Sequence, residues 1–112
     1  MCLFCKIAAK QIPAKIAFED DDLLAFHDIN PGAPTHLLVI PRKHLSSLDE
    51  ASADDQALLG KLLLACQRVA REQGLVQSGF RVVANTGPNA GQSVFHLHLH
   101  VLGGRPMGWP PG

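Results

Sequence analysis

The segment that decides the fold is residues 94–102, Val-Phe-His-Leu-His-Leu-His-Val-Leu. Polar and apolar residues alternate there, which predicts a strand whose successive side chains point to opposite faces of a sheet. One face then carries the imidazoles of His96, His98 and His100, spaced about 6.5–7 Å apart along the backbone. The apolar residues between them point toward the core. Packing alone does not explain three histidines on one face, so we interpret this strand as the centre of a functional site.

Outward from that strand, apolar runs bounded by turn residues predict four more strands, over residues 16–19, 23–28, 36–40 and 80–84. A short helix is expected over residues 3–10. A long helix is expected over residues 52–73, where Ser52 can cap the first turn together with Asp55. The apolar face of the long helix is expected to comprise Leu58, Leu59, Leu62, Leu63, Cys66, Val69 and Ala70.

Strands joined by short turns, with one crossover helix, predict an α+β fold with a five-stranded antiparallel sheet. The 112 residues suit a single domain, residues 1–112, in which residues 103–112 form an irregular tail rich in Gly and Pro. A hydrophobic content of 46% with 18% charged residues is typical of a globular protein. A chain this small readily buries its remaining apolar surface in a homodimer.

Charge and cysteine content limit the class of partner. The chain has 10 Lys and Arg against 10 Asp and Glu, whereas proteins that bind nucleic-acid backbones usually carry a basic excess. No apolar run approaches the roughly 20 residues of a membrane span, and the first residues do not have the pattern of a signal peptide. Three cysteines do not indicate a disulfide framework. We therefore expect a cytoplasmic protein that binds neither nucleic acid nor membranes.

Two kinds of chemistry can use a row of histidines. Histidines on one face of a strand can bind zinc, and a neutral imidazole can attack an electrophile. The preceding loop, residues 85–93, is rich in Gly and Asn, so its backbone N–H groups can converge on an anion. An anion-binding loop that leads into a histidine strand favours a phosphate presented to a histidine nucleophile. His27 has no metal-like spacing, and we interpret it as structural.

These residues resemble the histidine-triad (HIT) family, whose motif is His-x-His-x-His followed by two apolar residues. Nearly the whole chain is similar to the Hint branch, the nucleoside 5′-phosphoramidate hydrolases. The further stretches that match are residues 12–16, 26–29, 33–36, 39–44 and 109–112. The resemblance implies a HIT-like α+β fold, a homodimer whose two sheets run on into one, and a purine nucleotide substrate, an AMP or GMP amine.

The resemblance also implies roles by position. His98 is the nucleophile, and His100 and His36 complete the cluster around the α-phosphate. Backbone donors and a protonated His100 then stabilise the phosphate oxygens. Ser93 or a water donates the proton that the departing nitrogen needs.

For the nucleotide itself, the resemblance assigns Asp28 to the ribose hydroxyls, and Ile29 with Phe26 to the base pocket. The residues it assigns to the phosphate and leaving group are Asn85, Gly91, Gln92, Ser93 and Val94. Trp109 reaches the partner's site, although Gly108 stands where many relatives have His.

Cys2 and Cys5 form a C-x-x-C pair, which can be redox-active or can bind a metal. Some Hint-like bacterial proteins carry the same pair, and the resemblance implies a structural zinc completed by His44 and His96. No cofactor is expected for catalysis. The alternative is a disordered Cys2 and a buried, apolar Cys5.

Three other functions stay open from the sequence. The first is a dinucleoside polyphosphate hydrolase of the Fhit branch, against which the Trp-Pro-Pro-Gly tail argues. The second is a nucleotide-binding regulatory or scaffold protein. The third is a hydrolase with zinc on the three triad histidines.

Overall fold

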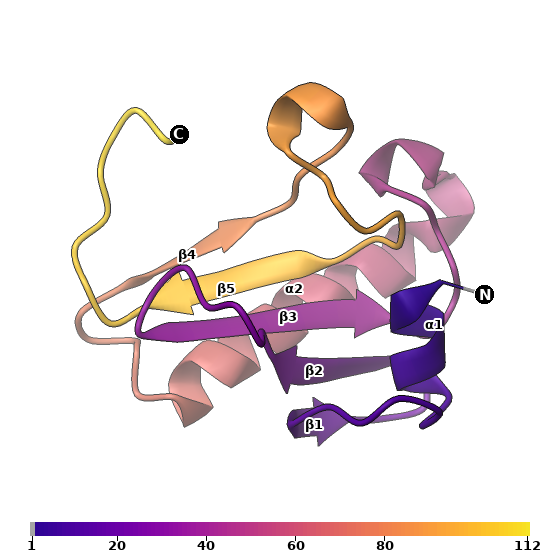
Figure 1. Ribbon diagram of the computed structural model, residues 1–112, viewed down its shortest axis with the longest axis horizontal. Helices are drawn as coiled ribbons and strands as arrows, with labels where there is room; N and C mark the ends of the chain where they lie inside the picture. The colour runs from indigo at the N-terminus through magenta and orange to yellow at the C-terminus, as the bar shows by residue number, and fades with distance from the viewer. Residues whose placement is uncertain (1) are drawn as a thin grey trace.

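A five-stranded antiparallel sheet forms the centre of the computed structural model, which describes residues 2–112, and its strand order is β1-β2-β3-β5-β4 (Figure 1). The strands are β1 (Ile16–Glu19), β2 (Leu23–His27), β3 (Thr35–Pro41), β4 (Phe80–Val83) and β5 (Leu99–Gly103). The α-helices are α1 (Leu3–Ala8) and α2 (Gln56–Glu72), and the 3-10 turns are η1 (Leu48–Glu50), η2 (Ala53–Asp55) and η3 (Pro88–Ala90). The predicted α+β fold, antiparallel sheet and long helix are confirmed.

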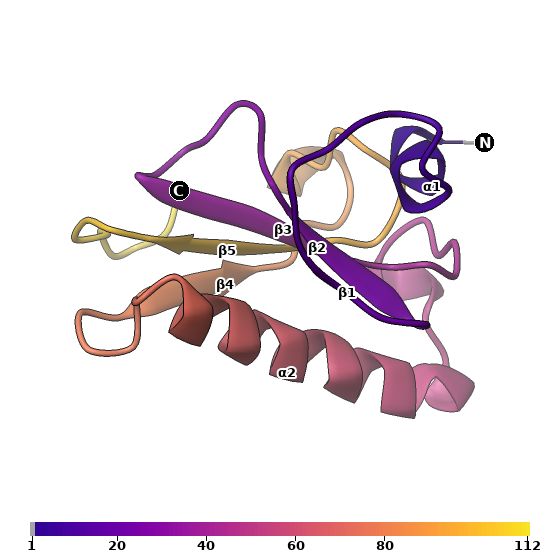
Figure 2. The ribbon, with the colours of Figure 1, turned by 90° about the horizontal axis from the view of Figure 1, so that it is seen from below.

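The two helices cover opposite faces of the sheet, as Figure 2 shows. Because strand side chains alternate, one set of β2, β3 and β5 residues packs on α2 and the other faces α1. The α2 side is a larger core that includes Leu37, Val39 and Val101. The α1 side is a smaller cluster in which Leu38 and Ile40 pack with residues of α1. The polar residues of the candidate site lie on this second face.

The predicted cap is present, but it caps the 3-10 turn η2, which leads directly into α2 at Gln56. The Ser52 hydroxyl accepts from the Asp54 N–H at 3.2 Å, and the Asp55 carboxylate accepts from the Ser52 N–H at 3.0 Å. The hydrogen bond from Lys43 Nζ, at 2.6 Å, holds the pKa of Asp55 below its usual value. The predicted apolar face is wrong at Leu63, which is 58% exposed because it lies outside the stripe that meets the sheet.

The predicted strand over residues 94–102 is shorter than expected and begins at Leu99. The ladder between β5 and β3 stops at the pair Val39–Leu99, two residues before β3 ends at Pro41. The Leu97 N–H donates instead to the Leu45 carbonyl at 2.6 Å. The alternation nevertheless continues, since Leu97 stays in the α2 core. Within residues 2–112, no helix is both long and apolar enough to cross a bilayer.

Candidate active site

A series of hydrogen bonds fixes the tautomers of two histidines on the α1 face. The Gly32 N–H donates to His36 Nδ1 at 2.9 Å, so the ring proton of neutral His36 is on Nε2. That Nε2–H faces His100 Nδ1 at 2.8 Å. His100 therefore carries its own proton on Nε2, and one backbone amide orients both rings.

His98 has the opposite tautomer. Its Nδ1 lies 2.6 Å from the His96 carbonyl oxygen, which can only accept, so Nδ1 carries the proton and Nε2 keeps a lone pair. The ring is 7% exposed and lines a cavity of about 280 Å³. Phe4 packs edge-on against it, with ring centroids 5.1 Å apart. His98 is thus held in one orientation and presents an unprotonated nitrogen.

Burial favours the neutral forms of His36 and His100. Loss of solvation lowers the pKa of His100 to about 4, assisted by the neighbouring His98 and His36 and opposed by Asp28. Burial also lowers the pKa of His36, again opposed by Asp28, whose Oδ2 lies 3.4 Å from His36 Nε2. The expected protonated His100 is therefore wrong for the free protein at neutral pH. His100 can still donate a hydrogen bond through Nε2–H.

The cavity beside His98 gathers most of the residues predicted to bind a nucleotide. They come from the end of β2, the loop before β5 and β5 itself, and comprise Phe26, Asp28, Ile29, Ser93, Val94, His98 and His100. Phe26 is buried, whereas Ile29 lies at the exposed rim. His27, interpreted as structural, lines the same cavity. An apolar pocket with a carboxylate and three imidazoles is a typical small-molecule site.

The loop before β5 differs in detail from the expected anion site. The Gly91 N–H donates to the Pro88 carbonyl, and the Gln92 N–H donates to the Gly87 carbonyl, each at 3.1 Å. The Gln92 side chain accepts from the Gly87 N–H and donates to the Ser46 and Val94 carbonyls. Gln92 and Gly91 therefore shape the loop. The amides of Ser93 and Val94 have no hydrogen-bond partner within residues 2–112, and both residues line the His98 cavity, so these amides can be offered to an anion there.

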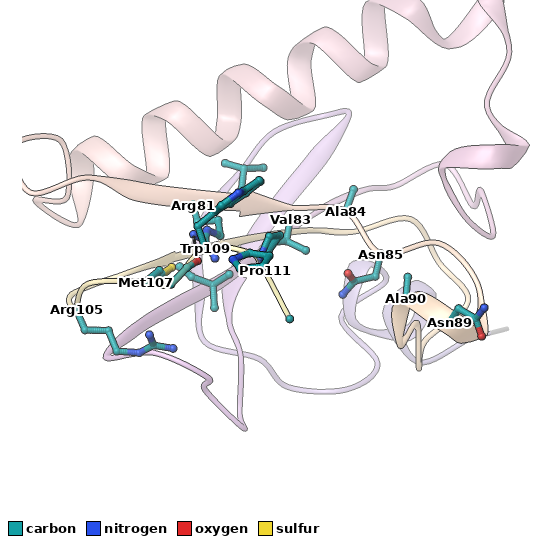
Figure 3. A pocket seen from close by; sticks show the side chains of 15 residues that line it. Arg81, Val83, Ala84, Asn85, Asn89, Ala90, Arg105, Met107, Trp109 and Pro111 are labelled. Carbon is teal, nitrogen blue, oxygen red and sulfur yellow. Dashed lines mark hydrogen bonds between the residues drawn. The ribbon is translucent and has the colours of Figure 1, made fainter.

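Asn85 and Trp109 lie apart from the His98 cavity. Both line a wider groove of about 880 Å³ between β4, η3 and the C-terminal tail (Figure 3). The Arg81 guanidinium donates to the Gly108 carbonyl at 2.8 Å and so ties the tail to β4. Trp109 is 82% exposed, and Figure 3 shows it with Pro111 beside Val83.

The predicted metal ligands form a compact cluster. The ligand atoms of Cys2, Cys5, His44 and His96 all lie within 4.8 Å of one another. The sulfur–nitrogen distances are 3.3–3.6 Å, and the two Nδ1 atoms are 3.2 Å apart. In a tetrahedral zinc site, bond lengths of about 2.0–2.3 Å separate neighbouring ligand atoms by about 3.3–3.8 Å.

The orientation of His96 also suits a metal. Its Nε2 lies 2.8 Å from the Pro41 carbonyl, so Nε2 carries the proton and Nδ1 turns a lone pair toward the two cysteines. Two thiols and two imidazole nitrogens around one point are the donor set that zinc prefers. The residues therefore fit a zinc ion. The three triad histidines, in contrast, do not converge on one point, since His96 turns to the cysteines and His98 turns to the cavity.

Two kinds of group in the site were not predicted from the sequence. Phe4 and Ile7 of α1 wall the cavity, and their i, i+3 spacing in the predicted helix was the available signal. The backbone groups that set the tautomers, namely the Gly32 N–H and the carbonyls of His96 and Pro41, leave no trace in residue type.

Comparison with known proteins defines the class to which this fold and site belong. The HIT domain model matches residues 9–107. The chain belongs to the HIT family.

Individual relatives resemble it along most of their length. An uncharacterized HIT-like protein of Synechococcus elongatus is 54% identical over 110 residues, which cover 98% of this chain and 96% of that protein. Protein HitA of Neisseria gonorrhoeae is 51% identical over 102 residues, covering 91% and 94%. The crystal structure of a HIT family hydrolase from Legionella pneumophila superimposes with a TM-score of 0.98 at 51% identity, over 100% of both chains.

Proposed function

We propose that the protein is a hydrolase of the Hint branch that cleaves the P–N bond of purine nucleoside 5′-phosphoramidates. The observation that carries the proposal is the tautomer of His98, whose free Nε2 belongs to a ring that lines the cavity. The likeness to a structure named as a HIT family hydrolase supports the same class of reaction. Asp28 at the end of β2 is a suitable acceptor for ribose hydroxyls, and Phe26 with Ile29 offers apolar surface to the base.

In the first step, His98 Nε2 attacks the α-phosphorus while the P–N bond breaks. The departing amine takes a proton from the Ser93 hydroxyl or from a water beside it, and the nucleotide remains on Nε2. The positive charge that develops on the ring is stabilised by the His96 carbonyl, which accepts from Nδ1–H. Phosphate oxygens accept from neutral His100 Nε2–H and from the amides of Ser93 and Val94.

In the second step, a water attacks the same phosphorus and the P–Nε2 bond breaks. The water returns a proton to the Ser93 oxygen, or to the bulk where a water was the donor, and the nucleoside monophosphate leaves. His98 regains its lone pair without changing tautomer, because Nδ1 keeps its hydrogen bond throughout. His36 and His100 keep their relative orientation through the Gly32 amide.

Trapping tests this mechanism directly. The protein is mixed with an adenosine phosphoramidate, quenched rapidly, digested and analysed by mass spectrometry. We expect an adenylate on the peptide at His98. The His98→Asn variant keeps a donor for the His96 carbonyl, so it should bind AMP with wild-type affinity and show no turnover. Wild-type turnover by this variant would falsify the assignment.

The same preparation separates the other candidate functions. Diadenosine polyphosphate hydrolysed faster than the phosphoramidate would favour the Fhit branch. Nucleotide binding without turnover of either substrate would favour a regulatory or scaffold role. Undiminished activity after chelation would count against a metal on the triad histidines.

We also propose a structural zinc at Cys2, Cys5, His44 and His96, on the fit of distances and tautomer described above. A bound zinc would cross-link α1 to the loops after β3 and before β5, and the chemistry it supplies is structural. Elemental analysis of freshly purified protein should find one zinc per chain, and His44→Ala should lose it. Wild-type protein without zinc would contradict the proposal.

We further propose that the protein is a homodimer joined through β4. This strand is an edge of the sheet, Phe80 on it is partly exposed, and the tail with Trp109 lies along it. Sedimentation should give twice the 12.0 kDa mass of the chain. Phe80→Lys should give the single mass, while Phe95→Lys, an exposed aromatic on the loop before β5, should not. A wild-type protein of single mass at micromolar concentration would refute this.

A further inference from the structure

Helix α1 stands between the metal cluster and the nucleotide cavity. Cys2 caps the helix, and its sulfur accepts from the Cys5 N–H at 3.2 Å, so both thiols sit at the first turn. The intervening Phe4 and the following Ile7 point to the other side and line the cavity. One short helix therefore presents ligands to the cluster and a wall to the substrate site.

A helix of this length does not hold itself in place. Six residues are too few for stable helix formation in water, so α1 depends on tertiary contacts. At its C-terminal end, Arg42 donates to the Ala8 carbonyl at 3.0 Å. At its N-terminal end, the polar side-chain contacts that reach across to other parts of the described chain are those of the two thiols with His44 and His96.

The wall that α1 contributes touches the reacting group. The Phe4 ring is 5% exposed and lies edge-on to His98, at a centroid distance of 5.1 Å and an interplanar angle of 89°. It also meets Phe26 edge-on, at 5.5 Å. The same ring thus contacts the nucleophile and the floor of the base pocket. A shift of α1 would therefore remove the contacts of Phe4 with both His98 and Phe26.

A second connection runs through His96. Its ring belongs to the metal cluster, while its carbonyl accepts the Nδ1–H of His98. The group that fixes the tautomer of the nucleophile therefore belongs to a residue whose side chain the cluster holds. The metal cluster thus contacts the candidate active site through α1 and through this peptide. The two connections meet, because the Phe4 ring also lies edge-on to the His96 ring at a centroid distance of 6.1 Å.

We propose that Cys2, Cys5 and His44 are positioning residues for the nucleophile, which act by gathering around a metal ion and so locking Phe4 and the His96 carbonyl against His98. The inference rests on the proposed hydrolase function and on the proposed zinc. It assigns these three residues an effect on substrate affinity and turnover, although none of them lines the His98 cavity.

The test compares three variants with the wild-type protein. Cys5→Ser removes a ligand, and Phe4→Leu removes the wall but keeps every ligand. Cys66→Ala is the matched control, because this third cysteine is buried in the α2 core and contacts neither α1 nor the cavity. The measurements are zinc content, the Kd of AMP by calorimetry, kcat and KM, melting temperature, and ¹⁵N shifts of the His98 ring.

We expect Cys5→Ser to lose zinc, to raise the Kd of AMP about threefold to tenfold, and to lower kcat as well. Its His98 nitrogens should show a mixture of tautomers. Phe4→Leu should retain zinc and weaken AMP binding to a similar extent. Cys66→Ala should lower the melting temperature while leaving zinc content, Kd and kcat at wild-type values.

Wild-type Kd, kcat and His98 shifts in a zinc-free Cys5→Ser protein would overturn the proposal. Should that variant not fold, chelation of zinc from the wild-type protein replaces it. The His98 shifts and the hydrogen exchange of α1 amides should then change, and should recover when zinc is added back. The shifts and exchange need no substrate, so they separate failure of this inference from failure of the hydrolase assignment.

Discussion

The neutral state of His100 predicts that acid destabilises the fold before it protonates the carboxylates. Burial lowers the pKa of His100 from 6.5 to about 4 in the folded protein. Between these values the unfolded chain binds a proton that the folded chain does not. The free energy of unfolding therefore falls as the pH drops from 7 through 6.5 toward 4, and it levels off below the folded pKa.

The size of the effect follows from the two pKa values of His100. Lowering the pH from 7 to 5 should cost about 2 kcal/mol through this residue alone. The pKa values of His27, His36 and His96 are also lowered, chiefly by burial, and add in the same direction. The contribution of His100 to this loss of unfolding free energy is isolated by comparing the wild-type protein with a variant that lacks this histidine.

Urea denaturation of the wild-type protein and His100→Gln, each at pH 7 and pH 5, provides that comparison. The glutamine carbonyl can still accept from His36 Nε2–H, but the side chain does not titrate. The wild-type protein should lose about 2 kcal/mol more than the variant over this interval. Equal losses in the two proteins would refute the argument that His100 is buried and neutral. Zinc content is measured at both pH values, so that metal loss is matched.

Three further predictions address separate parts of the structure. Gly103→Ala would put a methyl group 2.7 Å from both Leu75 methyl groups, so overpacking should cost roughly 1–3 kcal/mol in urea denaturation. Ser52→Ala removes the N-cap of the η2 turn that leads into α2 and should lower the free energy of unfolding by about 1 kcal/mol, with activity unchanged. His36→Ala leaves His100 Nδ1 without its donor and should lower kcat about tenfold with little change in KM, measured by steady-state kinetics; an unchanged kcat would exclude the orienting role.

The periodic parts of the chain were predictable because their pattern is local. Alternation, apolar runs bounded by turn residues and the three-to-four spacing of the long helix indicated these elements, and the ends of most of them differ from the prediction by no more than two residues. The N-terminal half of the histidine strand was not predictable in this way. Its conformation depends on where the ladder with β3 stops and on a hydrogen bond from Leu97 to Leu45, and both depend on the tertiary structure.

The candidate site was likewise predictable from the sequence only in part. The resemblance to the HIT family assigned the nucleophile role to His98 and completed the C-x-x-C pair with His44 and His96, and the distances among these four candidate metal ligands fit the donor geometry of zinc. Protonation states were not accessible, since the pKa of His100 depends on burial and the tautomers depend on backbone atoms. Likewise, the glycine-rich composition of the loop predicted an anion site, but which amides are free is decided by the turn that Gly87 and Gln92 close.

The two edge strands of the sheet differ in how readily a strand of another chain can pair with them. Strand β1 has an irregular register at Ile16–Phe18, and Glu19 at its end is bound by Lys10 and Arg42. Charges and irregularity of this kind discourage another chain from adding on. Strand β4, at the opposite edge, is the strand through which we propose that two copies pair. Two copies joined through β4 about a twofold axis would leave only their two β1 strands as free sheet edges. Association would then stop at the dimer and would not continue into a fibre.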